Sequence, residues 1–190
     1  MEKQIPELIE VPATKDSHRW VAVTALLLAI GVILHTISPN IGGVTPNWTI
    51  AMYSITISLT RPNLTRALGI GFVAGLTIVP SSKSAFPLGN IASELCGALT
   101  AAILVKAFFA VQLDNFKFKP FLIGGLSTCV SGSVFTLILK AILGLPFSVW
   151  THAMLPVVLA VGALNGLITQ VLFAPVQELF FRQGGNKAHE

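Results

Sequence analysis

The sequence has very little charge. Only 11% of its 190 residues are Asp, Glu, Lys or Arg, whereas 53% are hydrophobic. A soluble domain carries roughly 25% charged residues, so this chain has too few charges to cover a surface that faces water. The deficit excludes an ordinary soluble domain and indicates a protein that folds as one unit in lipid.

Cysteine is scarce as well. Cys96 and Cys129 both lie inside apolar runs, and their spacing fits neither a metal site nor a disulfide framework. Both are expected to be small buried residues. The formal net charge of +4 comes from basic residues scattered between apolar segments, which favours membrane topology over nucleic-acid binding. No metal, cofactor or nucleic-acid partner is therefore expected.

The sequence also lacks the motifs of a catalytic site. It contains no His-Glu-x-x-His, no Gly-x-Ser-x-Gly and no phosphate-binding loop ending in Gly-Lys-Ser/Thr. The chain is therefore not expected to be an enzyme or to hydrolyse ATP. Residues 1–19 include four acidic residues and no short apolar core before a cleavage site, so we interpret them as a cytoplasmic tail and not as a signal peptide.

Long apolar runs are what the sequence does have. A helix needs about 20 mostly apolar residues to cross the hydrocarbon core, and six runs are candidates: 20–37, 44–59, 64–79, 88–111, 121–143 and 153–174. The second and third are the weakest, since only residues 61–63 divide them clearly, and a re-entrant pair there is the alternative. The predicted fold is an all-α integral membrane bundle of six transmembrane helices over 20–175, between tails at 1–19 and 176–190.

Lysine and arginine in the short loops set the orientation, because cytoplasmic loops carry an excess of them. With six spans, only Lys83 and Lys140 fall on one side. The side that holds both termini collects Lys3, Lys15, Arg19, Arg61, Arg66, Lys117, Lys119, Arg182 and Lys187. Both termini are therefore predicted to be cytoplasmic.

Polar groups are costly inside lipid, so each embedded one is a candidate for function. Glu94 is the strongest. It lies about one and a half turns into the fourth predicted span and four residues after Asn90, so the two share a helix face. A buried carboxylate needs a cation or a hydrogen-bond network. The alternative is a purely structural pairing with Lys83 or a histidine.

The predicted topology brings polar and aromatic residues of all six spans to the outer face. The candidate solute-binding residues are His35, Asn47, Trp48, Lys83, Asn90, Glu94, Trp150 and His152. Each of the two tryptophans fits the aromatic belt at the membrane interface equally well. Lys140 is expected to snorkel, and Asn165, which lies deeper, is expected to make an interhelical hydrogen bond.

Small residues four apart allow helices to approach closely in lipid. The pairs Gly71/Gly75 and Gly162/Gly166 are expected to pack helices within the chain. The pair Ala25 and Ala29 in the first span resembles the Ala-x-x-x-Ala motif of the S components of energy-coupling factor transporters. Those small six-span subunits bind a solute and use the motif to dock on a membrane coupling partner.

Three stretches are similar to the bacterial tryptophan transporter family, which is related to the S components. They are LHTISP at 34–39, GGVTPN at 42–47 and AFPLGNI at 85–91. Where an Asp-Lys pair is expected after the last stretch, this chain has Ser93 and Glu94. The resemblance implies uptake of tryptophan or another aromatic or vitamin-like solute across the bacterial cell membrane. It also implies a membrane coupling protein and two ATPase subunits as partners.

Two classes of function follow from these observations. In the first, the chain is the solute-binding subunit of a transporter. For an amino acid, Glu94 would accept hydrogen bonds from the ammonium, Lys83 would meet the carboxylate and Trp48 would stack on an aromatic ring. The second is a non-transporting membrane scaffold or assembly factor, which predicts no specific ligand and a Glu94 paired within the chain.

Overall fold

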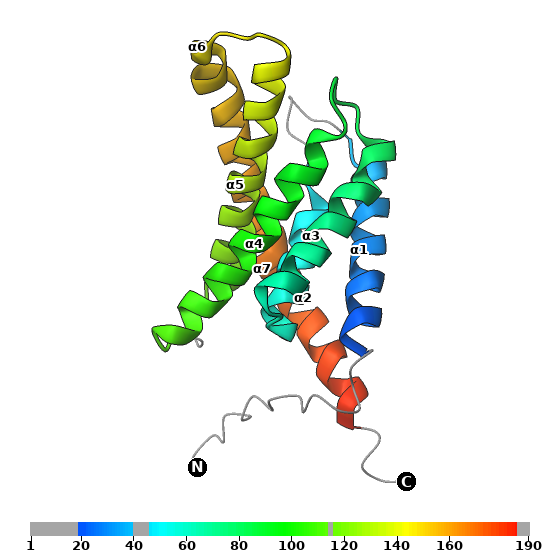
Figure 1. Ribbon diagram of the computed structural model, residues 1–190. Helices are drawn as coiled ribbons and strands as arrows, with labels where there is room; N and C mark the ends of the chain where they lie inside the picture. The colour runs from blue at the N-terminus through cyan, green and yellow to red at the C-terminus, as the bar shows by residue number, and fades with distance from the viewer. Residues whose placement is uncertain (1–18, 40–45, 114–115, 186–190) are drawn as a thin grey trace.

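The computed structural model of the chain describes residues 19–39, 46–113 and 116–185, and every element in these ranges is helical (Figure 1). In order, the elements are α1 (Arg19–Ile37), α2 (Trp48–Thr60), α3 (Leu64–Ile78), the 3-10 turn η1 (Val79–Ser81), α4 (Gly89–Ala110), α5 (Lys119–Ile142), α6 (Phe147–Val149), the π-helical turn η2 (Trp150–Met154) and α7 (Leu155–Gly185). The all-helical class predicted from the sequence is confirmed.

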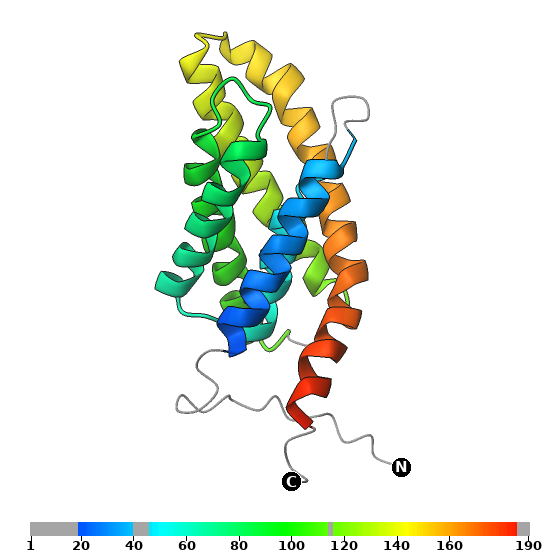
Figure 2. The same ribbon diagram turned by 90° about the vertical axis from the view of Figure 1, so that its right-hand side faces the viewer.

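The described chain runs up and down one bundle. The elements α6, η2 and α7 follow one another without a break, and α7 returns along α5 (Figure 1, Figure 2). The start of α1 and the end of α7 lie at the same end of the bundle in both views, which we call the terminal end. The opposite, distal end carries α6 and the connection between α3 and α4.

In the part of the chain that the structure describes, five helical segments are long and apolar enough to cross a membrane: Trp20–Ile37, Leu64–Ser81, Gly89–Ala110, Lys119–Ile142 and Phe147–Leu179. The 13-residue α2 is too short to be one of them. At 1.5 Å per residue it spans about 20 Å, against a hydrocarbon core of about 30 Å. Six full crossings and cytoplasmic termini therefore remain predictions. So do the tail boundaries, although α7 continues as helix past residue 175 to Gly185.

The short helix α2 is the centre of the bundle. Every residue from 49 to 58 is buried. One face of α2, with Ile50, Tyr53 and Ile57, packs in the same cluster as residues of α3 and α4. Another face, with Met52 and Ile55, packs among residues of α1 and α7. A helix buried on all sides has no face turned to water, which explains why α2 carries no charged residue and mixes apolar side chains with hydroxyl side chains all round.

Glycines set the helix contacts that place α4 and α7. A methyl group on Gly71 would come within 2.6 Å of the carbonyl oxygen of Glu94, so α3 packs directly on the turn of α4 that carries this residue. Gly162 and Gly166 make the corresponding approach of α7 to α5, where a methyl group on Gly166 would lie 2.9 Å from the ring of Phe121. The prediction that these pairs pack helices within the chain is confirmed.

Candidate solute site

Glu94 lies inside the bundle with only 1% of its surface exposed. Its Oε1 accepts a hydrogen bond from the side-chain amide of Asn47 at 2.9 Å. Its Oε2 is buried and has no hydrogen-bond partner among the described residues. Among these described residues, no basic side chain pairs with the carboxylate. Within the described ranges, Glu94 is therefore a buried acid with one free oxygen and no cationic partner.

Asn47 joins Glu94 to the start of α2. It is the N-cap residue of that helix, and its Oδ1 accepts from the backbone N–H of Ile50 at 3.4 Å. Asparagine is among the preferred residues at this position, because its side chain satisfies an N–H that the helix leaves unpaired. With the oxygen used in this way, the amide nitrogen is free to donate to α4. The capping of α2 by Oδ1 therefore orients the amide nitrogen of Asn47 toward the carboxylate of Glu94.

Asn165 on α7 holds Asn47 in turn. Its Oδ1 accepts from the backbone N–H of Asn47 at 3.1 Å, and its Nδ2 donates to the carbonyl oxygen of Asn47 at 3.0 Å. The same Nδ2 donates to the hydroxyl of Thr128 on α5 at 3.0 Å. Asn165 is completely buried, so these bonds form away from water. The interhelical hydrogen bond predicted for this residue is confirmed, and the network ties α2, α4, α5 and α7 together.

Tyr53 is the residue of this region that the sequence analysis missed. It is fully buried on α2, and its hydroxyl lies beside the carboxyl of Glu94. Like Oε2, the hydroxyl oxygen has no hydrogen-bond partner among the described residues. The signal for it was a phenol within an apolar run, since a polar group at such a place is a candidate for function.

His35 and Trp48 lie close to Asn47 along the chain, and each is half-buried. Nδ1 of His35 is hydrogen-bonded to the carbonyl oxygen of Pro46 at 3.2 Å, and Nε1 of Trp48 donates to the hydroxyl of Ser38 at 2.6 Å. These bonds fasten both ends of the connection between α1 and α2. Residues 40–45 of that connection, including most of the GGVTPN stretch, lie outside the described residues.

Asn90 and Lys83 belong to the distal end of α4 and the connection before it. Asn90 shares the face of Glu94, one turn earlier, but its amide donates to the hydroxyl of Ser82 at 3.1 Å and to the carbonyl oxygen of Pro87 at 2.8 Å. It therefore fastens the connection between α3 and α4. Lys83, on that connection, is exposed.

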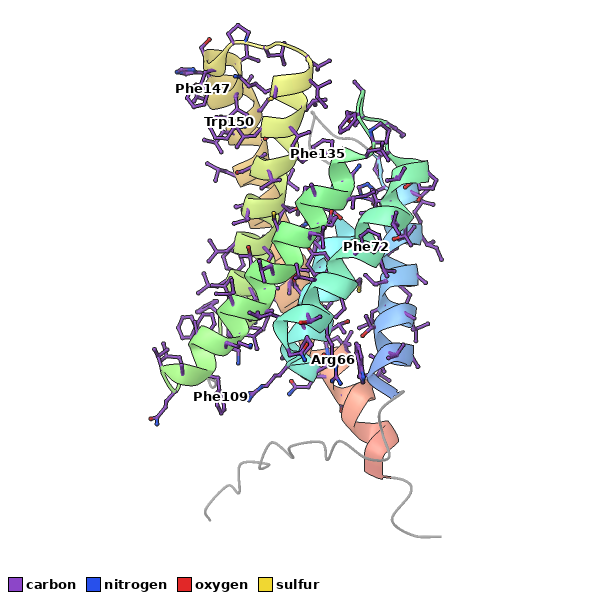
Figure 3. All side chains as sticks on the ribbon, in the orientation of Figure 1. Arg66, Phe72, Phe109, Phe135, Phe147 and Trp150 are labelled. Atoms are coloured by element: carbon purple, nitrogen blue, oxygen red, sulfur yellow. The ribbon has the colours of Figure 1, made fainter. Side chains whose placement is uncertain are left out.

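Trp150 and His152 lie on the turn η2 at the distal tip of the α5–α7 hairpin. Nε1 of Trp150 donates to the hydroxyl of Thr136 at 3.0 Å, and its ring stacks on Phe147 with centroids 5.3 Å apart (Figure 3). His152 is exposed, and its Nδ1 is 2.9 Å from the carbonyl oxygen of Ser148. The polar groups of Trp150 and His152 thus bond within the α5–α7 hairpin and not to the other predicted residues. Asn47 and Glu94 are the two predicted residues that the structure joins directly.

The Asn47–Glu94–Tyr53 cluster is suited to binding a small polar group. It offers a carboxylate and a phenol, both with unused hydrogen-bonding capacity, in a buried setting. Among the described residues there is no group of three or more His, Cys, Asp or Glu side chains that could hold a metal ion. Apolar helices of membrane length around an interior polar cluster define the class as a multi-pass membrane protein with a candidate site for a small solute.

Comparison with known proteins gives the family. The family model described as "Tryptophan transporter TrpP" matches residues 17–181 of the chain, so the chain belongs to this family. It is 30% identical over 175 residues to a "Probable tryptophan transport protein" of Clostridium perfringens, covering 86% of this chain and 94% of the relative. A protein of the same name from Bacillus subtilis is 28% identical over 162 residues, covering 85% and 91%. No solved structure matches the chain.

The resemblance seen in the three sequence stretches is thus confirmed. The chain is a transport-family protein of the bacterial membrane, with several membrane-length helices.

Proposed function

We propose that this protein is the solute-binding subunit for uptake of tryptophan or a similar aromatic amine. The observation that carries the proposal is the buried carboxylate of Glu94, which among the described residues has one free oxygen and no basic side chain paired with it. An ionised carboxylate taken out of water without a partner is strongly unfavourable. A protonated amine on the solute would supply the missing charge when it binds.

The basic side chains named as alternative partners of Glu94 lie elsewhere. Lys83 is exposed on the α3–α4 connection, and His152 is exposed on η2. The ring of His35 bonds to the backbone of Pro46. A structural pairing of Glu94 with any of these three therefore has no support.

The relatives are named for tryptophan transport, and tryptophan carries both an ammonium and an aromatic ring.

We propose further that transport depends on a partner that docks on α1. Ala25 and Ala29 are exposed on this helix, and their neighbours Leu26 and Ile33 are 62% and 60% exposed. Small residues on an open helix face let another helix approach closely. The resemblance of this alanine pair to the docking motif of S components implies a membrane coupling protein carrying two ATPase subunits as the partner. The sequence itself contains no phosphate-binding loop.

The orientation proposed for the bundle places the terminal end in the cytoplasm. Arg66 lies at this end, where its guanidinium is 5.3 Å from the ring centroid of Trp20 (Figure 3). Arg61, which follows α2, lies 4.9 Å from the ring centroid of Phe109. Arginine beside aromatic rings at one end of a bundle is typical of the cytoplasmic membrane interface. The solute would then enter from the distal end.

A thermal-shift screen of the purified protein tests the proposed function. A ligand that binds only the folded state raises the melting temperature by mass action. We expect tryptophan to stabilise the protein in a concentration-dependent manner, and leucine, which lacks the aromatic ring, to have a much smaller effect. If no aromatic amino acid or vitamin stabilises it, the solute-binding role is wrong and the scaffold hypothesis takes its place.

A further inference from the structure

We infer that Tyr53 is a specificity-determining residue, which together with the free oxygen of Glu94 receives the amino group of the solute. This inference deepens the proposed function and rests on it. It assigns a role to a residue outside the set expected from the sequence. It also states which end of an amino acid is recognised inside the bundle.

The contact between α2 and α4 holds two unused polar atoms. The Tyr53 hydroxyl lies beside the carboxyl of Glu94, and this hydroxyl and Oε2 of Glu94 are each buried without a hydrogen-bond partner among the described residues. Buried polar atoms are nearly always paired, and those that are not call for an explanation. In a family of transport proteins, two such atoms on neighbouring side chains are explained by a group that arrives with the solute.

Helix α4 has space for the Tyr53 hydroxyl at Gly97. A methyl group on Gly97 would overlap the Tyr53 hydroxyl, so the phenol reaches α4 only because residue 97 has no side chain. Gly97 lies three residues after Glu94 and therefore on the same face of α4. The absence of a side chain at residue 97 thus places the phenol one turn from the carboxylate.

The helices α2, α4 and α5 meet at a junction around Gly97 that is lined by hydrogen-bond acceptors. The turn of α5 that packs on Gly97 carries Ser127, whose hydroxyl is also buried without a partner. The junction thus offers a carboxylate oxygen and two hydroxyl oxygens, and among the described residues no basic side chain pairs with the carboxylate. An ammonium has three N–H donors and no acceptor, so it matches this set. A carboxylate placed here would meet Glu94 and be repelled.

It follows that the site recognises the amino group of the solute and not its carboxylate. Tryptamine keeps the amine and lacks the carboxylate, whereas indole-3-propionate keeps the carboxylate and lacks the amine. We expect tryptamine to bind the unmodified protein within about tenfold of tryptophan. Indole-3-propionate should bind at least about 100-fold more weakly, because the charge-assisted hydrogen bonds to the amine are missing.

Calorimetric titration of the full-length protein with these three compounds is the test, applied to wild type, Tyr53→Phe and Thr56→Val. Tyr53→Phe removes only the hydroxyl and should weaken tryptophan and tryptamine about tenfold or more, with little change for indole-3-propionate. Its ligand-free melting temperature should equal or exceed that of wild type, since the lost oxygen has no partner. Thr56→Val is the matched control: this buried α2 hydroxyl donates to the carbonyl oxygen of Met52, so binding should be unchanged.

The outcomes separate the inference from the proposed function. If wild type binds none of the three compounds, the proposed function fails. If wild type binds tryptophan but binds indole-3-propionate equally well, the inference is overturned and the transport role stands. Full affinity of Tyr53→Phe for tryptophan overturns the inference as well. The comparison of ligands on wild type needs no variant, so it decides whether the amino group is recognised even if Tyr53→Phe does not fold.

Discussion

The side chain of Asn165 bonds to both backbone polar groups of Asn47, a residue 118 positions earlier in the chain. It accepts from the N–H at 3.1 Å and donates to the carbonyl oxygen at 3.0 Å. Asn47 begins α2 and donates to Glu94. Through this pair, α7 fixes where α2 begins and how the amide of Asn47 meets the carboxylate.

Replacing Asn165 with Ala should therefore weaken both folding and solute binding. The backbone N–H of Asn47 would lose its partner, and a buried unsatisfied group costs about 1–3 kcal/mol. The carbonyl oxygen of Asn47 would keep its bonds from the backbone N–H groups of Ile50 and Ala51. Gln170→Ala is the matched control, because Gln170 makes the same kind of pair on the same helix, bonding to the N–H of Phe121 and the carbonyl of Lys117. Thermal unfolding should show both variants destabilised, and titration should show solute affinity reduced only for Asn165→Ala. Equal affinities in the two variants would mean that Asn165 has no influence on the site.

Glu94→Gln should fold and insert normally but bind the solute at least tenfold more weakly. Losing a buried charged partner of a ligand costs roughly 2–5 kcal/mol, which is about a 30- to 5,000-fold loss of affinity. Calorimetric titration measures it, with Glu178→Gln, an exposed carboxylate on α7, as control. If Glu94→Gln binds as tightly as wild type, Glu94 is structural and the site must be sought near Trp48 and Trp150.

Single cysteines should report the orientation of the bundle. Lys83 and Lys117 are both exposed and belong to opposite ends of α4. In a protein whose Cys96 and Cys129 are replaced by Ser, an impermeant thiol reagent added outside cells should label a cysteine at 83. It should reach positions 117 and 187 only after permeabilisation; position 187 lies outside the described residues. Labelling of 187 in intact cells would contradict the six-span orientation.

Ala25→Leu and Ala29→Leu should separate binding from transport. Both alanines are exposed on α1, so a leucine side chain at either position would not clash with the core of the protein. The added volume would hold a docking helix away. We expect solute affinity and melting temperature to stay at wild-type values while uptake into cells is lost, and Ala160→Leu, at an exposed position of α7, to transport normally. Normal uptake by both α1 variants would exclude docking at this pair.

Gly71 and Gly69 offer a test of helix packing with a built-in control. At Gly69 no atom lies within 4 Å of an added methyl group, whereas at Gly71 the methyl would come within 2.6 Å of the Glu94 carbonyl oxygen. Alanine is favoured over glycine in helices by up to about 1 kcal/mol, so Gly69→Ala should be neutral or stabilising. Gly71→Ala should lower the melting temperature and, by displacing the turn that carries Glu94, reduce solute affinity. A stabilised Gly71→Ala would show that α3 and α4 are not in close contact there.

The sequence alone determined those features that depend on neighbouring residues. The apolar runs at 20–37 and 64–79 correspond to α1 (Arg19–Ile37) and α3 (Leu64–Ile78), because helix length and hydropathy are local properties. Glu94 could be singled out because a carboxylate within an apolar run is costly wherever it lies. The family could be recognised from short stretches of sequence, and the match to residues 17–181 confirmed it.

The tertiary structure decided which polar atoms meet. Tyr53 lies in a helix that is buried on all sides, so no periodicity pointed to the face that carries its hydroxyl. Only the packing of α2 on Gly97 brings that hydroxyl to Glu94. In the same way, Trp150 was assigned to the solute face from its place along the chain, but its N–H bonds to Thr136 on another helix. Composition and spacing indicate that a polar group lies within an apolar segment. Its hydrogen-bond partner depends on contacts between residues that are far apart in the sequence.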